Sequence, residues 1–524
     1  MSRQETFVQH IQSGYTFKGD YLTLGAAILD GEPQKDAQVH IPLKTLNRHG
    51  LIAGATGTGK TVTLQIIAEN MASKGIPVLV MDLKGDLSGL AMPGTSNVKI
   101  EERHAAIGIP YAAEGCSTEM LSLSKEKGTR LRATVSEFGP VLFSKILELN
   151  DTQGGIVAII FKYADDNNLP LLDLKDFKRL LQFVTDEGKT EVEKEYGKIS
   201  SASVGTIMRK IIELETQGAE LFFGEKSFEV SDLTRLDQFG KGMISVVRLT
   251  DIQDRPKLFS TFMLQMLAEI YATFPEAGDM DKPKLCVFID EAHLIFNEAS
   301  DALLDQIESI IKLIRSKGVG IYFCTQNPYD IPDAVLSQLG LKVQHALRAF
   351  TEKDRKAIKK TAENYPISEF YKTDELLTSI GIGQALITAL NEKGVPTPLA
   401  ATHLRAPKSR MGVLSAEELD RVVQYSFIAA KYNEEIDRES AYEILNAKLI
   451  NARSQTEEEE VDAPAPKKKT TQKEERSVLE SLSKNTMVRQ VGNTVMREVA
   501  RGLLGVLGLG GSTKKKRGGG LFGF

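Results

Sequence analysis

The eight residues from Gly54 to Thr61 read GATGTGKT, and they constrain the fold of this 524-residue chain more than any other stretch. They match the pattern G-x-x-x-x-G-K-[ST], in which a glycine-rich turn joins a strand to a helix. Gly54, Gly57 and Gly59 let the backbone curl so tightly that successive N–H groups point inward at phosphate oxygens. The sequence therefore predicts a loop that cradles the phosphates of a nucleoside triphosphate.

The end of this loop predicts how the phosphates and a metal ion are held. Lys60 is placed to reach the β- and γ-phosphates, and the Thr61 hydroxyl is a ligand for Mg²⁺. The flanks fit, since HGLIAG reads as an apolar strand and VTLQIIAENMAS as a helix whose N-terminus adds positive dipole. The expected nucleotide contacts are Gly54, Ala55, Thr56, Gly57, Thr58, Gly59, Lys60, Thr61 and Val62.

A second motif supplies the carboxylates that such a site needs. Residues 285–289 read as a buried parallel strand, and Asp290 and Glu291 follow it directly. Asp290 is expected to hold Mg²⁺ through its water shell, and Glu291 to polarise the water that attacks the γ-phosphate. This pattern indicates hydrolysis in addition to binding. The alternative is an acidic strand end that only caps a helix.

The letters DEAH at residues 290–293 also occur in a large class of helicases, but the arginine-rich and Ser-Ala-Thr motifs of that class do not follow. Instead GVGIYFCTQNP forms a strand that ends at Gln326, a neutral residue suited to sensing the γ-phosphate or the attacking water. Upstream, VLVMD ends in Asp82, where the second core strand would place a side chain beside the nucleotide; a helix cap is the alternative. Lys84 and Asp86, in the LKGD stretch that follows, are weaker candidates for a position beside the nucleotide.

In this order the motifs resemble the HerA/FtsK class of P-loop ATPases over about residues 43–404, and within it the bacterial HerA-like proteins that lack the full N-terminal barrel. The resemblance implies an α/β fold, a RecA-like P-loop NTPase core with a central, mostly parallel sheet. It also implies ATP and Mg²⁺ as cofactors, a hexameric ring, and an arginine that reaches each site from the neighbouring subunit. Arg315 best matches that arginine, and Arg48 and Arg348 are the other candidates; a solvated helix end or a surface ion pair explains each equally well.

The rest of the chain predicts smaller parts around this core. We expect a small β segment at 1–45 packed on the core at 46–404, a helical insertion at 112–223, and a helical extension at 413–453. A disordered linker (454–476), an amphipathic helical segment (477–510) and a basic glycine-rich tail (511–524) follow. The amphipathic segment could pack on its own ring, on a partner or on a membrane surface.

Composition, cysteine spacing and the lack of apolar segments bear mainly on where in the cell the protein is expected. The net charge of −5 does not exclude a polymer substrate, because a ring needs positive charge only on its pore loops. Cys116, Cys286 and Cys324 fit neither a disulfide framework nor metal spacing. The chain starts without an apolar signal region, and no stretch approaches the roughly 20 apolar residues that span a bilayer. We therefore expect a cytoplasmic protein.

The motifs and the resemblance leave two possible functions, a motor enzyme and a regulatory ATPase. The first is a motor that hydrolyses ATP and translocates on double-stranded DNA, with a nuclease or another protein as partner; the DNA substrate rests on the resemblance alone. The second is a nucleotide-gated regulatory or protein-directed ATPase, in which the helical insertion binds a partner. A module that binds nucleotide without hydrolysing it is disfavoured, because Glu291 and Gln326 occur together.

Overall fold

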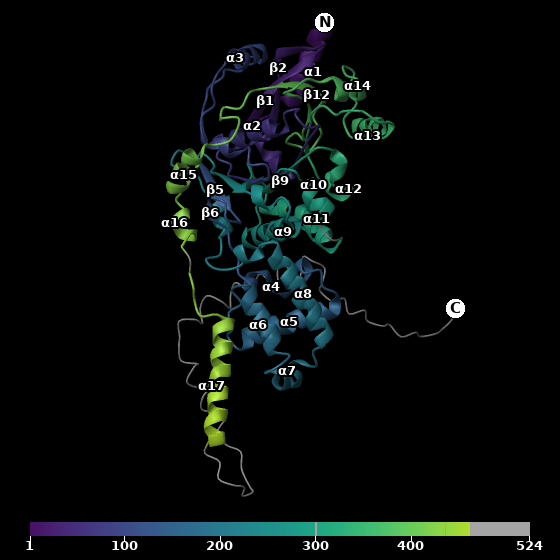
Figure 1. Ribbon diagram of the computed structural model, residues 1–524. Helices are drawn as coiled ribbons and strands as arrows, with labels where there is room; N and C mark the ends of the chain where they lie inside the picture. The colour runs from purple at the N-terminus through teal and green to yellow at the C-terminus, as the bar shows by residue number, and fades with distance from the viewer. Residues whose placement is uncertain (299–300, 435, 462–524) are drawn as a thin grey trace, which may run out of the picture. The chain divides into compact units, whose positions relative to one another are not determined.

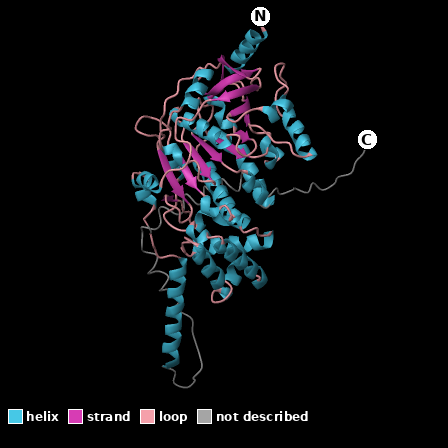
Figure 2. Ribbon diagram, turned by 45° about the horizontal axis from the view of Figure 1, so that its top comes forward, coloured by secondary structure: helices cyan, strands magenta, loops and turns pink. Residues whose placement is uncertain are grey.

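A single 12-stranded sheet, in the order β2-β1-β12-β11-β10-β3-β9-β8-β4-β7-β5-β6, organises the chain. The computed structural model describes residues 1–298, 301–434 and 436–461. Residues 1–453 form one compact unit and residues 454–524 a second. The strands, magenta in Figure 2, lie in the first unit and carry helices around them.

The parallel part of the sheet holds the predicted nucleotide motifs. Its strands are almost wholly buried, and all but β5, β6 and β10 are mostly apolar, as expected for a sheet that is covered on both faces. Because the strands run in the same direction, the residues that follow them meet at one edge of the sheet. These strands are β10 (Leu341–Gln344), β3 (Gly50–Ala53), β9 (Val319–Thr325), β8 (Leu285–Ile289), β4 (Val78–Asp82), β7 (Ile244–Arg248), β5 (Thr118–Ser122) and β6 (Thr129–Arg130).

The antiparallel part extends the sheet beyond β10. Its strands are β11 (Gln384–Thr388), β12 (Ala400–Leu404), β1 (Tyr21–Leu29) and β2 (Glu32–Pro42). The expected β segment at 1–45 thus belongs to the main sheet, and it also contains a helix, α1 (Arg3–Tyr15), that the sequence analysis did not predict. Ser2 and Glu5 form a capping box that begins α1, and Phe7, Ile11 and Tyr15 recur every four residues on its buried face.

The helical insertion is present, but it does not begin where the sequence suggested. The expectation of helix from residue 112 is wrong for 118–130, because β5 pairs in register with β7 and β6 with β5. These two short strands are buried among sheet neighbours, which the local pattern of so few residues does not reveal. The helices lie together in Figure 1 and are α4 (Val135–Ile146), α5 (Asp151–Asp166), α6 (Leu174–Phe183), α7 (Lys189–Tyr196) and α8 (Ser201–Thr216).

The other helices flank the sheet or follow it. Helix α2 (Lys60–Ser73) contacts β1, β3, β4, β7 and β9, and helix α9 (Pro256–Thr273) contacts α4, α10 and α11. Within the described residues no helix is both long and apolar enough to cross a bilayer. The remaining helices are α3 (Val98–Ile107), α10 (His293–Glu298), α11 (Asp301–Ile314), α12 (Asp333–Leu336), α13 (Glu352–Glu363), α14 (Thr373–Ser379), α15 (Ala416–Gln424), α16 (Ala429–Tyr432) and α17 (Ala441–Val461).

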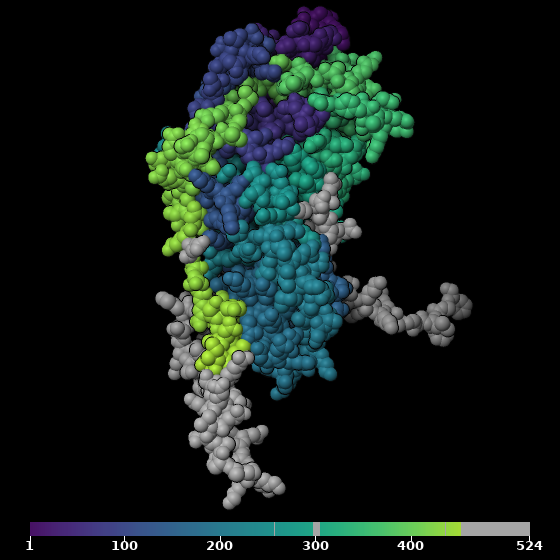
Figure 3. Space-filling view, viewed as in Figure 1, coloured from purple at the N-terminus to yellow at the C-terminus, as the bar shows by residue number. Residues whose placement is uncertain are grey.

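The chain beyond β12 runs over the surface toward α15 and α16, where it is light green in Figure 3. Glu69 of α2 fixes the start of this segment: its carboxylate accepts hydrogen bonds from the backbone N–H groups of Lys408 and Ser409, at 2.8 and 3.0 Å. Helix α17 continues to Val461, so residues 454–461 are helical where a disordered linker was expected. The rest of that segment, the amphipathic segment and the tail lie outside the described residues.

Candidate nucleotide-binding site

The predicted phosphate loop lies between β3 and α2, as its sequence requires. Its backbone is tied to both neighbouring strands: Gly54 donates to the Thr325 carbonyl at 3.3 Å and Ala55 to the Ala346 carbonyl at 2.9 Å. Gly54 has a φ of +153°, and a Cβ atom there would lie 2.5 Å from the Cβ of His345. The loop therefore needs glycine at this position because a neighbouring element packs directly against it.

Lys60, the first residue of α2, turns back into the loop. Its ammonium group donates to the Ala55 carbonyl at 3.2 Å, and only 6% of the residue is exposed. Thr61 and Val62 follow in the first turn of the helix. The predicted loop residues are thus gathered around a buried ammonium group, the arrangement that binds the phosphates of a nucleotide.

A second layer that the sequence analysis missed supports the loop from behind. Thr63 in α2 shares a hydrogen bond of 2.9 Å with Nε2 of the buried His345. Burial lowers the pKa of His345 to about 4, so this imidazole is neutral at pH 7. On another side, the Gly383 N–H donates to the Thr58 carbonyl at 3.2 Å. No local motif predicts either contact, since each partner is distant in sequence.

Arg103 of α3 extends this support to a third element. Its guanidinium group donates to the carbonyl oxygens of Gly383 and Leu404, at 3.1 and 2.9 Å. Because Gly383 also contacts Thr58, the guanidinium group fixes the turn that touches the phosphate loop. Burial lowers the pKa of Arg103, which nevertheless remains charged.

The acidic pair after β8 lies at the same edge of the sheet as the loop. Asp290 is 1% exposed, and neither of its carboxylate oxygens has a hydrogen bond of good geometry within the described residues. The adjacent Glu291 N–H and the Cys324 thiol, a weak donor, face the carboxylate. Burial raises the pKa of Asp290. A buried carboxylate without strong donors is costly unless a cation binds it.

These residues fit a magnesium ion that is bound together with a nucleotide. The Thr61 hydroxyl interacts with the carboxylate of Asp86, which was only weakly indicated by sequence and whose pKa is raised by burial. Within the described part of the chain, no three histidine, cysteine or acidic side chains converge to hold a metal by themselves. Mg²⁺ usually takes one or two protein oxygens and completes its shell with phosphates and water. Thr61 and Asp290 would supply these protein oxygens, with Asp86 beside them.

Glu291 occupies an unusual backbone position. Its φ is +47°, a left-handed conformation that non-glycine residues adopt rarely and that recurs at functional sites. The side chain is buried and forms an ion pair with Lys84, while His293 Nδ1 lies 3.2 Å from its other oxygen. The strained turn thus aims the carboxylate at Lys84, a residue of the LKGD stretch.

Asp82 is the last residue of β4, and Gln326 directly follows β9; these two strands lie on the two sides of β8. The Asp82 carboxylate accepts the Gly85 and Leu87 N–H groups at 2.7 and 3.1 Å, so it caps the turn after β4. Burial raises the pKa of Asp82 to about 7. Gln326 lies 3.5 Å from the Thr56 hydroxyl, which places the end of β9 next to the phosphate loop.

The three candidate arginines fall into two groups. Arg315 and Arg48 precede β9 and β3, and desolvation together with the Arg48 charge lowers the pKa of Arg315, so the two lie close together. Both therefore lie at the edge of the sheet where these strands begin. The phosphate loop lies where the strands end, and the seven residues of β9 put about 20 Å between the two edges. Neither arginine can reach the loop of its own chain. Arg348 differs, because its guanidinium group donates to the Thr56 carbonyl at 3.3 Å.

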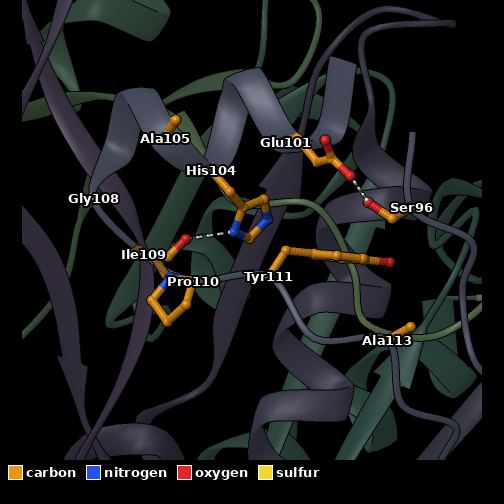
Figure 4. A pocket seen from close by; sticks show the side chains of 9 residues that line it. All are labelled: Ser96, Glu101, His104, Ala105, Gly108, Ile109, Pro110, Tyr111 and Ala113. Atoms are coloured by element: carbon orange, nitrogen blue, oxygen red, sulfur yellow. Dashed lines mark hydrogen bonds between the residues drawn. The ribbon is translucent and has the colours of Figure 1, made fainter. Parts of the chain in front are cut away.

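A separate cavity of about 580 Å³ opens beside α3 and shares no residue with the phosphate loop (Figure 4). His104 lies in its wall: Nδ1 faces the Ile109 carbonyl at 2.7 Å, and Nε2 accepts the Ala406 N–H at 3.1 Å. The Tyr111 ring packs edge-on against this imidazole at 5.0 Å. Both nitrogens of His104 are thus used in holding the wall together.

Comparisons with known proteins give similarity along most of the chain. Residues 28–515 match the family model described as helicase HerA-like, C-terminal. The "DNA double-strand break repair helicase HerA" of Sulfolobus acidocaldarius is 23% identical over 368 residues, which cover 67% of this chain and 64% of that protein. The protein of the same name from Saccharolobus solfataricus is 23% identical over 365 residues with the same coverage. The chain thus spans about 64% of the length of the curated relatives it matches.

Solved structures align more loosely. The plasmid coupling protein TrwB bound to a non-hydrolysable ATP analogue aligns with a TM-score of 0.49 and 15% identity, over 76% of this chain and 99% of that one. VirB4 of Thermoanaerobacter pseudethanolicus aligns with a TM-score of 0.45 and 15% identity, over 74% and 98%. At such values the alignments add nothing to the sheet topology described above.

Proposed function

Because this chain belongs to the HerA-like helicase C-terminal family, we propose that it is a Mg²⁺-dependent ATPase that works as a ring-forming motor of the HerA/FtsK class. The observation that carries the proposal is the buried carboxylate of Asp290, which lacks strong hydrogen-bond donors within the described residues and lies beside Glu291 at the sheet edge where the phosphate loop also lies. A carboxylate that only caps a helix or turn would accept several well-formed backbone N–H bonds, as Asp82 does, whereas only the adjacent Glu291 N–H faces Asp290 within the described residues.

In the proposed reaction the chain's own groups bind, orient and accept a proton. The loop N–H groups and Lys60 hold the phosphates, and Thr61 and Asp290 hold Mg²⁺, which when bound offsets the negative charge that develops during transfer. Glu291 accepts a proton from the attacking water, and Gln326 orients that water from the end of β9. Asp82 shapes the turn that lines this edge.

The placement of Arg315 and Arg48 supports assembly of several subunits. Both lie at the edge of the sheet opposite the phosphate loop, where a neighbouring chain's loop could meet them. We assign Arg315 to the charge on the neighbour's γ-phosphate, with Arg48 beside it as a supporting group. A closed ring, proposed as a hexamer, lets each subunit give an arginine and receive one.

Double-stranded DNA is the proposed polymer, because the curated relatives are named as DNA double-strand break repair helicases. The alternative is a regulatory or protein-directed ATPase in the cytoplasm that has no DNA substrate. The test is ATP hydrolysis by the purified protein with and without double-stranded DNA, with Lys60→Ala as the blank. Stimulation by DNA supports the motor and motivates a search for a nuclease partner. Lys60-dependent turnover that ignores DNA contradicts the motor and favours the alternative.

A further inference from the structure

The ion pair between Lys84 and Glu291 is not explained by the roles assigned so far. Lys84 is exposed, with 41% of its side chain open to solvent, and it contacts the carboxylate that is proposed to accept the proton from water. Burial acts to lower the pKa of Lys84, but the contact with Glu291 and the charge of Asp290 outweigh it and raise that pKa. The ammonium group is therefore charged and held at the acidic edge.

This contact is incompatible with the chemistry proposed for Glu291. One carboxylate oxygen is engaged by Lys84, and the other lies 3.2 Å from His293 Nδ1. With one oxygen held by Lys84 and the other beside His293, the carboxylate does not face the water that it is proposed to activate. The ion pair must open before Glu291 can accept a proton from water, and Lys84 then needs another anionic partner.

The turn that carries Lys84 is held by hydrogen bonds and close packing, so the exchange requires a movement of the side chain and not of the backbone. The Asp82 carboxylate binds the N–H groups of Gly85 and Leu87 on either side of the turn. A Cβ atom on Gly85 would lie 2.6 Å from the Thr250 methyl group, which shows how closely the turn is packed. Lysine has a flexible stem that carries a compact charge, and this one is open to solvent along part of its length.

The terminal phosphate of a bound triphosphate is the anion that arrives at this edge. Strand β4 lies next to β8, and β8 is separated from the loop strand β3 by β9 alone, so the residues after β4, β8 and β3 converge. We propose that Lys84 exchanges Glu291 for the terminal phosphate when ATP binds, and that this exchange frees Glu291 for proton transfer. Lys84 thereby distinguishes a triphosphate from a diphosphate. This inference rests on the proposed ATPase function.

The test compares the affinities of the full-length protein for a non-hydrolysable ATP analogue and for ADP, both with Mg²⁺. In Lys84→Met, which keeps the length of the stem but removes the charge, we expect the preference for the triphosphate to fall about tenfold, with the ADP affinity unchanged. Turnover should fall by about tenfold or more because the transferred phosphate loses a cation. Lys178→Met is the matched control, since Lys178 is a half-buried lysine paired with Glu215 at 2.6 Å in the helical insertion.

Several outcomes would overturn the exchange. An unchanged preference for the triphosphate, or an equal loss of ADP affinity, removes Lys84 from the terminal phosphate. A rise in turnover would show that Lys84 only restrains Glu291. If Lys84→Met does not fold, Lys84→Gln answers the same question. If the wild-type protein binds neither nucleotide better than Lys60→Ala, the proposed function itself fails, whereas wild-type discrimination that Lys84→Met retains contradicts this inference alone.

Discussion

The guanidinium group of Arg348 donates a hydrogen bond to the Thr56 carbonyl oxygen, 3.3 Å away, in the phosphate loop of its own chain. Arg315, at the opposite edge of the sheet, has no such access. Arg348 follows β10 and Arg315 precedes β9, the strands on the two sides of β3. In the proposed ring, Arg348 therefore acts in its own site and Arg315 in a neighbour's. Variants of these residues should behave differently when subunits are mixed.

Mixing Arg315→Ala with Lys60→Ala subunits should restore hydrolysis that neither variant shows alone. At some interfaces the intact phosphate loop of an Arg315→Ala subunit meets the intact Arg315 of a Lys60→Ala subunit. Random mixing creates such interfaces at up to roughly a quarter of the sites. The measurement is ATP turnover after co-assembly, across a series of mixing ratios. Recovery that never exceeds the sum of the separate variants would argue against a role in the neighbouring site.

Arg348→Ala is the matched control for that experiment. Because Arg348 contacts its own loop at an exposed position, we expect a loss of nucleotide affinity of only about two- to fivefold. Mixing this variant with Lys60→Ala should leave the loss unchanged, since no neighbour can replace a contact within one chain. Titration of a fluorescent nucleotide measures both quantities. Rescue by mixing would instead place Arg348 at the interface.

Arg103→Ala should weaken both the fold and the site. The variant removes the side-chain donor of the Leu404 carbonyl, while the Gly383 carbonyl keeps the Leu404 N–H at 3.1 Å; a buried group that stays unpaired costs about 1–3 kcal/mol. Nucleotide affinity should fall as well, because Gly383 holds Thr58. Urea unfolding measures the loss of stability, and nucleotide titration measures the loss of affinity. Arg3→Ala, which removes an exposed ion pair with Asp30, should cost less than about 1 kcal/mol and leave affinity unchanged.

The contrast between Lys60 and Arg103 shows how far the sequence could predict this site. Lys60 and Asp290 lie in short motifs, where chemistry and spacing are local and therefore readable. Arg103 and His345 reach the loop from distant elements, through contacts that only the sheet order creates. Asp86 lies within a visible stretch, but its neighbour Thr61 is fixed by the packing of α2 beside β4. Long-range pairing also explains why the short strands β5 and β6 were expected to be helical.

Glu291→Gln should separate binding from turnover. The amide keeps the shape of the side chain but cannot accept the proton from water, so hydrolysis should fall by about two orders of magnitude or more while ATP stays bound. Turnover under saturating ATP tests the loss of hydrolysis, and a nucleotide affinity measurement tests the retained binding. The left-handed backbone at this position applies equally to both side chains, so a folding defect is not expected. Wild-type turnover in the variant would remove Glu291 from the reaction.

The buried His49 links the start of β3 to β9 and α11, and it should make stability depend on pH. Its Nδ1 accepts the Ile321 N–H at 3.0 Å, so the proton is on Nε2, which donates to the Ile311 carbonyl at 2.9 Å. Burial lowers the pKa of His49 to about 4, against about 6.5 in the unfolded chain. As the pH falls below 6.5 the unfolded chain takes up the proton first, so the contribution of His49 is complete above that pH and is lost toward pH 4.

The stabilisation lost through His49 between pH 7.5 and pH 5 should reach about 2 kcal/mol. Other groups titrate in the same range, among them Asp82, whose raised pKa acts in the opposite direction. The comparison is therefore with His49→Asn, because asparagine does not titrate and the unusual backbone at this position, with a φ of +57° and a ψ of 170°, strains both side chains alike. Urea unfolding at both pH values should show a smaller loss in the variant. Equal losses in the two proteins would mean that His49 is not held neutral in the folded chain.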